Sequence, residues 1–368
     1  MINGARVALL DTENLRGQAA ISLSVDGDPL QPGHATNPAR DAARVRTLAL
    51  QQGYSLAGVG PIGPHPEHVH LQEFLDRGYA GTMDYLRKTA TKRMDPSEVS
   101  PWARSALVVG LIYETPFPHT DALIDPESDQ AYPDADERLW ISRYGWGRDY
   151  HRVLTRMNRR LVRQLKEAFG PEHDFRQWVD TGPLMEKVLA THAGLGWMAK
   201  NTLVVNPMVG SWFFLGVILT SLDLQPTGAV PDHCGSCTAC LDVCPTDAFV
   251  EPYVLDATRC ISYRTIETRE NELPVDQSSG LAPHLFGCDL CQDVCPFNRK
   301  SPMTTLNDFH PRNLGEAPRR ADVDAFLKRP EQARERLIGT PLKRTGPEGL
   351  QRTVRWLDEV QSKDGDLE

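Results

Sequence analysis

The order of apolar and polar residues divides the first two thirds of the chain into alternating strands and helices. An almost unbroken apolar run over residues 106–113 predicts a buried strand. Residues 149–169 carry apolar side chains every three or four positions, and most of their arginines fall on the opposite side. This pattern predicts a long amphipathic helix. Asn37 followed by Pro38 is a typical helix start, so we predict a helix over residues 39–52 that a glycine ends.

The remaining pattern predicts shorter elements. Strands are expected at residues 55–59, 175–179, 202–205 and 212–220, and helices at residues 67–77, 183–193, 322–328 and 346–361. The strands at 202–205 and 212–220 are expected to form a hairpin across residues 207–210. Residues 1–38 lack periodicity and contain several glycines and prolines, so we predict an extension there, either disordered or the product of an over-long gene start.

Together these elements predict three regions after the extension. Residues 39–225 form an α/β core, residues 226–300 a segment of loops and short helices that contains every cysteine, and residues 301–368 a short helical tail. A dinucleotide-binding motif is absent from the sequence, because Gly194 and Gly196 lack a third glycine and follow a predicted helix rather than a strand.

The eight cysteines carry the strongest chemical signal. Those of the first group are Cys234, Cys237, Cys240 and Cys244, with Pro245 after the last. Those of the second group are Cys260, Cys288, Cys291 and Cys295, with Pro296 after the last. This spacing is typical of a ferredoxin-like domain that holds two [4Fe–4S] clusters, which transfer single electrons. Four disulfides would suit a small secreted chain, and zinc sites need neither three cysteines at two-residue steps nor the prolines, so both alternatives are less favoured.

The prolines also predict which cysteines bind together. In two-cluster proteins the cysteine before the proline ligates the other cluster. We therefore predict one cluster on Cys234, Cys237, Cys240 and Cys295, and the second on Cys244, Cys260, Cys288 and Cys291.

Composition and charge bound the class of protein. The chain has 368 residues, of which 40% are hydrophobic, enough for a sizeable core. Neither a membrane-spanning run nor a secretory signal is evident, so we expect a cytoplasmic protein, where reducing conditions suit such clusters. The net charge of −9 argues mildly against nucleic acid as a partner. However, basic residues concentrate at 143–166 and again at 312–355, which is compatible with RNA binding as well as with solvated helix faces.

Chemistry in the core is expected where a predicted strand ends. Asp180 follows the strand at 175–179 and precedes the helix at 183–193, a position where α/β folds place functional groups. Its alternative role is to cap that helix. Glycines next to tryptophans, as at Gly196 and Gly210, allow close approach of a flat ligand but also occur in ordinary turns. His151 by itself is more typical of a helix start than of a ligand.

Several segments together resemble the epoxyqueuosine reductase family, the last enzyme of queuosine synthesis in tRNA. The resemblance extends over about residues 40–345. The matching segments are residues 78–86, Arg93 with Asp95 and Pro96, and residues 143–151, 179–187, 193–202, 210–214, 233–245, 259–263 and 286–296.

The resemblance implies a cofactor, a substrate and a mechanism. The family holds a base-off cobalamin, here cob(II)alamin, between the clusters and a core related to corrinoid reductive dehalogenases, and it reduces epoxyqueuosine at the wobble position of tRNAs with GUN anticodons (Asp, Asn, His and Tyr). Asp180 matches the family's proposed proton donor, so we expect a raised pKa for its carboxyl. Expected cobalamin contacts are Arg93, Tyr144, Asp180, Lys200, Asn201, Trp212 and Ser262.

The resemblance also sets expectations for partners. An electron donor such as flavodoxin or ferredoxin would supply the clusters, and the protein is expected to be a monomer without a membrane partner. Many family members carry a longer helical-repeat tail, so tRNA affinity is expected to depend here on the basic helix and the arginines of the tail. The alternatives are another corrinoid reductase of the dehalogenase kind, which usually carries a twin-arginine signal, and a non-catalytic electron-transfer subunit.

Overall fold

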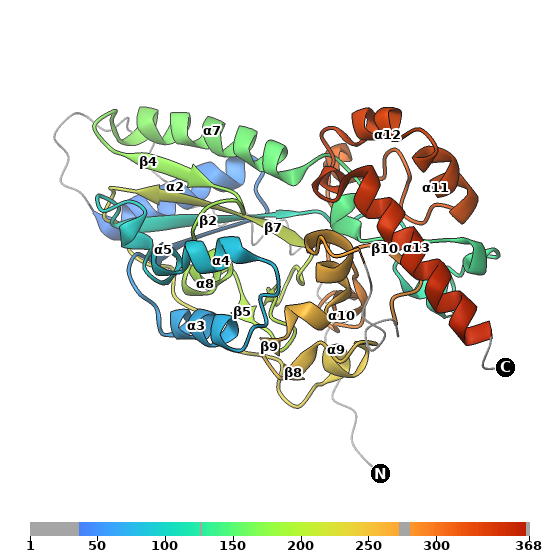
Figure 1. Ribbon diagram of the computed structural model, residues 1–368. Coiled ribbons are helices and arrows are strands. Elements are labelled where there is room, and N and C mark those ends of the chain that lie inside the picture. Colours follow the sequence, from blue (N-terminus) through green and yellow to red (C-terminus); the bar gives the residue numbers. More distant parts are fainter. Residues whose placement is uncertain (1–36, 126, 272–279, 366–368) are drawn as a thin grey trace, which may run out of the picture. The chain divides into compact units, whose positions relative to one another are not determined.

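A four-stranded sheet organises the core of the computed structural model, which describes residues 37–125, 127–271 and 280–365 (Figure 1). The predicted extension therefore lies almost entirely outside the described residues. The strands, in spatial order, are β1 (Leu56–Pro61), β2 (Ser105–Ile112), β7 (Phe213–Thr220) and β4 (Phe175–Trp178), and all three pairings are antiparallel. The predicted α/β core is thus built on an antiparallel sheet.

The two faces of this sheet are covered by different helices (Figure 1). Along β2, Leu107 and Val109 pack into the core formed with α2 (Pro38–Gln51) and α7 (Tyr150–Phe169). Their neighbours Ala106 and Val108 pack into the opposite core, beneath α8 (Glu186–His192). Burial of both faces explains the unbroken apolar run of this strand.

The long helices begin where the sequence indicates. Asn37 accepts a hydrogen bond from the backbone N–H of Arg40 at the start of α2. Asp149 accepts one from the backbone N–H of His151 at the start of α7. These caps fix the direction in which both helices leave their loops.

The predicted hairpin between residues 202–205 and 212–220 is wrong. β6 (Val204–Val205) pairs instead with β5 (Trp197–Met198), while β7 lies between β2 and β4. The chain turns over residues 206–210 and is then held by Asn298, whose side-chain oxygen accepts a hydrogen bond of 2.6 Å from the backbone N–H of Ser211. The long apolar strand is thereby directed into the middle of the sheet, where both of its faces are buried.

The cysteine-bearing segment consists of loops and short elements, as predicted. These are α9 (Ala239–Asp242), β8 (Phe249–Glu251), β9 (Val254–Leu255), β10 (His284–Phe286) and α10 (Leu290–Asp293). β10 runs parallel to β3 (Trp140–Ile141). Beside this pair, the buried carboxylate of Asp289 accepts hydrogen bonds from Trp140 Nε1 (3.1 Å), Ser142 Oγ (2.6 Å) and the backbone N–H of Arg143 (2.7 Å). The segment is thus joined to the chain that leads into α7.

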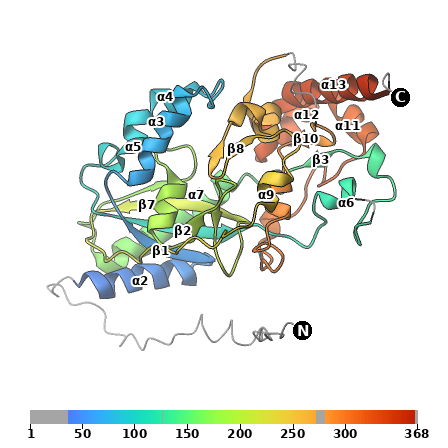
Figure 2. The same ribbon diagram turned by 90° about the horizontal axis from the view of Figure 1, so that it is seen from below.

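Small helices complete the molecule. Figure 2 shows α3 (Val69–Asp76), α4 (Asp84–Lys88) and α5 (Ala90–Met94) together, away from α11 (Arg320–Leu327), α12 (Pro330–Leu337) and α13 (Gly346–Gly365). A further short helix, α6, spans Asp121–Ile124. The helical tail is confirmed, but α12 was not predicted because only two of its eight side chains are buried, Ala333 and Leu337. No helix in the described ranges is long and apolar enough to cross a membrane.

Candidate active site and cluster-binding segment

An open cleft of about 780 Å³ lies where β4 ends and α7 begins. Asp180 enters it from the loop after β4, and Tyr150 and His151 enter it from the first turn of α7. Arg344 reaches it from the short helix Pro341–Arg344 and pairs with Glu267 through two hydrogen bonds of 2.7 and 2.6 Å. Residues distant in the sequence therefore share one cavity.

Asp180 is the centre of a short polar chain in this cleft. Its Oδ2 accepts hydrogen bonds from Tyr150 Oη at 3.0 Å and His151 Nε2 at 3.1 Å. The other ring nitrogen of His151 lies 2.7 Å from Asp149 Oδ1. Asp180 has a φ of 56°, a left-handed conformation that aspartate tolerates better than most residues. Its side chain remains 57% exposed, so the carboxylate is open to a ligand.

The structure contradicts the expectation that Asp180 has a raised pKa. The surrounding protein acts to raise the pKa of this carboxyl, but the hydrogen bond and charge of His151 and the hydrogen bond from Tyr150 outweigh it, so the net shift is downward. For His151, partial burial lowers the pKa while Asp149 and Asp180 raise it, to about 9. At neutral pH the proton is therefore on His151, between two carboxylates.

One acidic and one basic residue, Glu186 and Lys187, extend this arrangement towards the cysteines. The surrounding protein and the charge of Asp180 raise the pKa of Glu186 to about 8. Lys187 donates a hydrogen bond to Thr202 O at 2.9 Å. The protein around Lys187 lowers its pKa, although it lies close enough to Asp180 and to the Cys260 and Cys291 thiols to feel their charges. The side chain of Lys187 is nevertheless exposed.

All eight cysteines lie within the described residues and have free thiols. One small cavity is lined by four of them, Cys234, Cys237, Cys240 and Cys295. Burial and the charges of the other three thiols raise the pKa of Cys240 to about 11. In the other group, burial and the thiols of Cys260, Cys240 and Cys244 raise the pKa of Cys291. The structure therefore places Cys295 with the first group of thiols, and Cys244 beside Cys260 and Cys291.

Two of the expected cobalamin contacts, Tyr144 and Asp180, line the cleft. Arg93 binds Leu184 O at 2.9 Å and lies close enough to Glu186 and the cleft residue Tyr85 to affect their pKa values. Lys200 and Asn201 line the cysteine cavity, where Lys200 Nζ donates to Gly235 O (2.7 Å) and Cys237 O (2.9 Å). Ser262 neighbours Cys260, and Trp212 has no exposed surface. Contact of a ligand with the Trp212 side chain is thus excluded in this structure, because the core covers it.

Two buried polar atoms bear on whether the cleft fits a cofactor. Trp178 lines the cleft, and among the described residues its indole Nε1 has no hydrogen-bond partner. Glu186 Oε1 also lacks a partner among the described residues, although Glu186 does not line the cleft. Unpaired buried polar atoms are costly, so a bound polar group that reached the Trp178 indole N–H would stabilise it. The size of the cleft and its polar lining fit a large polar cofactor.

The sequence alone did not identify the polar chain. His151 was interpreted as a helix-start residue, and Tyr150, Arg344, Glu267 and Glu186 were not singled out. The available signal was the tripeptide Asp149-Tyr150-His151, which places a cap, a hydroxyl and an imidazole on the first turn of one helix.

Comparison with known proteins identifies the class first. Residues 233–298 match the family described as a 4Fe-4S double cluster binding domain. The fold and the two groups of thiols thus define an iron–sulfur protein. Residues 93–181, which include Asp149, His151 and Asp180, match the family described as Epoxyqueuosine reductase QueG, DUF1730.

Full-length relatives are more specific. The chain is 38% identical to epoxyqueuosine reductase of Pseudomonas aeruginosa over 322 residues, which is 87% of this chain and 84% of that one. It is 35% identical to epoxyqueuosine reductase of Escherichia coli over 303 residues, covering 81% and 77%. The chain therefore belongs to the epoxyqueuosine reductase family and is an oxidoreductase.

Solved structures agree. An epoxyqueuosine reductase bound to a tRNA-Tyr epoxyqueuosine-modified stem loop is 27% identical, with a TM-score of 0.73, covering 85% of this chain and 80% of that one. The Bacillus subtilis enzyme, solved with its catalytic aspartate loop swung out of the active site, is 27% identical with the same coverage and a TM-score of 0.72. The predicted combination of an α/β core, a double-cluster domain and a helical C-terminal segment is thus confirmed.

Proposed function

We propose that this protein reduces epoxyqueuosine to queuosine at the wobble position of tRNAs with GUN anticodons, and that the reaction takes place in the cleft at Asp180. The observation that carries the proposal is the exposed Asp180 carboxylate, which is hydrogen-bonded to a protonated His151 and lies close to Lys187. Lys187 in turn lies near the thiols of Cys260 and Cys291. A stem loop carrying epoxyqueuosine is the ligand in the related solved structure. The proposed setting is the cytoplasm, with a flavodoxin or ferredoxin as electron donor and a monomeric enzyme.

The chain would hold two kinds of cofactor. Cys234, Cys237, Cys240 and Cys295 would bind one [4Fe–4S] cluster, and Cys244, Cys260, Cys288 and Cys291 the other. The cleft would hold cobalamin, with Tyr144, Asp180 and the unpaired Trp178 indole N–H as contacts. When bound, these groups would supply the two electrons that the reduction requires, one at a time.

The protein's own contribution is control of protons. Conversion of the epoxide to the alkene consumes two electrons and two protons and releases one water. The Asp180 carboxylate faces the cleft, where it can relay a proton to the oxygen of the opening ring. His151 stores that proton, because its pKa of about 9 keeps the ring protonated at neutral pH. Tyr150 holds the Asp180 carboxylate in position.

The test is conversion of the modified nucleoside. Reconstituted protein with cobalamin and a chemical reductant is incubated without oxygen with tRNA that carries epoxyqueuosine, and the nucleosides are analysed by mass spectrometry. We expect queuosine to form with the wild type. If epoxyqueuosine persists although iron, cobalamin and tRNA binding are all measured, the proposed function is wrong.

Paired substitutions test the assignment of cysteines to clusters. If Cys244 ligates the second cluster, Cys244→Ala and Cys260→Ala remove ligands from the same cluster, so the double variant should retain about as much iron as either single variant. Cys244→Ala combined with Cys240→Ala should instead remove ligands from both clusters and lose most of the iron. Iron analysis and electron paramagnetic resonance of reduced protein measure this. The reverse pattern would show that each group holds its own cluster.

A further inference from the structure

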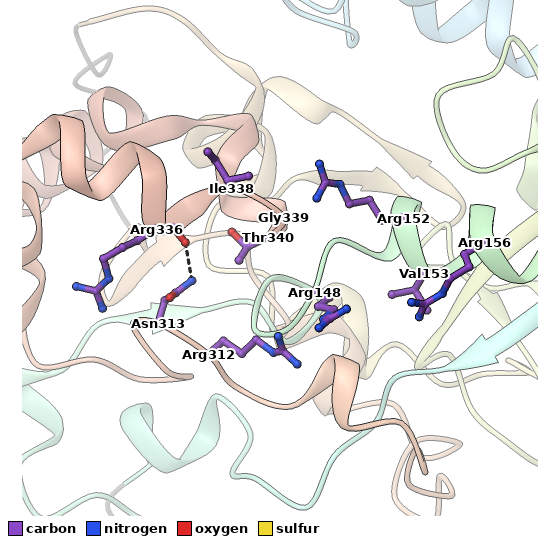
Figure 3. Close-up of a pocket in the computed structure, with 10 residues that line it drawn as sticks. All are labelled: Arg148, Arg152, Val153, Arg156, Arg312, Asn313, Arg336, Ile338, Gly339 and Thr340. Atoms are coloured by element: carbon purple, nitrogen blue, oxygen red, sulfur yellow. Dashed lines mark hydrogen bonds between the residues drawn. The ribbon is translucent and has the colours of Figure 1, made fainter.

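A second hollow, of about 360 Å³, lies beside the cleft and is lined by five arginines (Figure 3). Arg152 and Arg156 come from the first two turns of α7 and Arg148 from the loop before it, while Arg312 and Arg336 come from the C-terminal region. We call this hollow the arginine pocket. The fold therefore unites the two basic regions at residues 143–166 and 312–355, and this juxtaposition concentrates positive charge on an otherwise acidic protein.

Most of this positive charge is not neutralised by the protein. Asp308 is the acidic partner, with its carboxylate 3.0 Å from Arg148 Nε and 3.6 Å from Arg156 Nη2. Within the part of the chain that the structure describes, Arg152, Arg312 and Arg336 have no ion pair. The guanidinium groups of Arg148, Arg152, Arg156 and Arg312 with one carboxylate leave a positive field at this concave site, which attracts anions, whereas the Arg336 side chain points away from them (Figure 3).

The backbone that carries these arginines is held in place. Asn313 Nδ2 donates a hydrogen bond of 2.9 Å to the carbonyl oxygen of Arg336, as Figure 3 shows. The guanidinium carbon of Arg336 lies 4.9 Å from the centroid of the Phe326 ring. The backbone N–H of Asp149 donates to Gly339 O at 2.7 Å, which joins the start of α7 to the C-terminal region. The two sides of the pocket are thus fixed to each other.

The pocket adjoins the cleft that contains Asp180. His151 lines the cleft and the next residue, Arg152, lines the pocket. Thr340 borders both cavities. If the base of a nucleotide occupies the cleft, the phosphates on either side of that nucleotide lie at the rim of the cleft. The arginine pocket lies at that rim.

Basic side chains continue beyond the pocket along α7. The exposed residues Arg159, Arg160, Arg163 and Lys166 follow Arg156 at intervals of about one helical turn. A single free phosphate would occupy the pocket alone. A series of cations along about 20 Å of helix suits instead a chain of phosphates, because each turn can contact a further one.

From this geometry we infer that the arginine pocket binds phosphodiester groups of the tRNA anticodon loop next to the nucleotide in the cleft. The inference rests on the proposed function, since it assigns the base to the cleft. Guanidinium groups suit the task because their parallel N–H groups bind phosphate oxygens in pairs. The pocket then supplies substrate affinity and orientation, and it takes no part in the reduction.

The test compares two charge-matched double variants of the cofactor-loaded protein. Arg152→Gln with Arg312→Gln removes two charges from the pocket. Arg329→Gln with Arg355→Gln removes two exposed arginine charges that lie neither in the pocket nor on α7 and have no ion pair within the described residues. Fluorescence anisotropy measures binding of a labelled anticodon stem loop. We expect at least a tenfold loss of affinity for the pocket variant and less than a twofold loss for the control.

Salt dependence and kinetics sharpen the result. The slope of log affinity against log salt should fall by about 1.4 for the pocket variant, because each lost phosphate contact on a single strand is worth about 0.7. In turnover assays KM should rise while kcat stays close to the wild-type value. Equal affinity of the pocket and control variants for the stem loop would overturn the inference.

A competition experiment separates RNA from a free anion. Inorganic phosphate is titrated against the stem loop and compared with chloride at matched ionic strength. If phosphate displaces the stem loop no better than chloride does, the pocket recognises the RNA chain, as inferred. If low millimolar phosphate occupies the pocket while the pocket variant binds RNA normally, the site serves a free anion and the inference is wrong. Failure of the wild type to convert epoxyqueuosine would contradict the proposed function separately, because the stem-loop affinities of the pocket and control variants can still be compared.

Discussion

The cleft and the arginine pocket meet at α7 and Thr340, yet they treat charge in opposite ways. In the cleft, acids and bases are matched: His151 lies between Asp149 and Asp180, and Arg344 is paired with Glu267. In the arginine pocket, Asp308 pairs with Arg148 and Arg156, while Arg152 and Arg312 have no ion pair within the described residues. Matched charges fix where a proton is held, whereas unmatched charges are available to a ligand. The same helix end thus borders matched charges on one side and unmatched positive charges on the other.

This comparison explains how an acidic chain can carry a locally basic surface. The net charge of −9 is a sum over the whole sequence, but a polyanion senses the local field. The Asp180 carboxylate is held by side chains of the first turn of α7, Tyr150 and His151. The arginines are exposed and can be altered individually with little effect on folding.

The largest expected effect comes from the centre of the cleft. Asp180→Asn keeps a residue that tolerates the positive φ but removes the group that relays the proton. We expect the rate of epoxyqueuosine conversion to fall by about 10²- to 10⁴-fold. Stem-loop affinity and iron content should match the wild type. A rate within threefold of the wild type would show that the proton follows another path.

The second prediction removes the matching of charges around His151. Asp149→Asn retains a good helix cap but removes one of the two carboxylates that raise the pKa of His151 to about 9. The pH at which the rate declines on the alkaline side should therefore move down from about 9 towards neutrality. Rates measured from pH 6 to 10 test this, and an unchanged alkaline limb would exclude His151 as the proton store.

The charges of His151, Asp149 and Asp180 also predict how the stability of the protein depends on pH. His151 has a raised pKa, so its contribution is complete below the ordinary histidine pKa of about 6.5 and is lost as the pH rises through about 9. Asp149 and Asp180 have lowered pKa values, so their contribution is present above about 3.8 and is lost in more acidic solution. The thermal unfolding temperature of the wild type should therefore fall between pH 7 and 10, and it should fall by less in Asp149→Asn.

The smallest effect should be a gain in the arginine pocket. Asp308→Asn removes the acid that partly neutralises Arg148 and Arg156, while the backbone contact of residue 308 with the N–H of Arg148 is kept. We expect stem-loop affinity to increase about two- to fivefold at low salt, with the gain vanishing at high salt because the effect is electrostatic. Weaker binding would mean that Asp308 positions these arginines instead of competing with the ligand.

The sequence predicted what depends on local spacing. The β2 run and the caps of α2 and α7 involve residues within a few positions of one another, and the cysteine grouping follows from a recurring spacing with a proline after each fourth cysteine. The polar chain was not predictable, because it needs Asp180 to meet His151 across 29 positions. The arginine pocket depends likewise on contacts between α7 and the C-terminal region. The hairpin was mispredicted because Asn298, 87 residues away, redirects the chain at Ser211.

The hydrogen bonds of Asp289 have a consequence for how the protein matures. This residue lies inside the iron-binding loop between Cys288 and Cys291, yet its carboxylate supports the backbone from which Tyr144 and then α7 continue. We therefore expect the ordering of this loop around iron to help order the backbone before α7 as well, so that uptake of iron and folding of this part of the core are coupled.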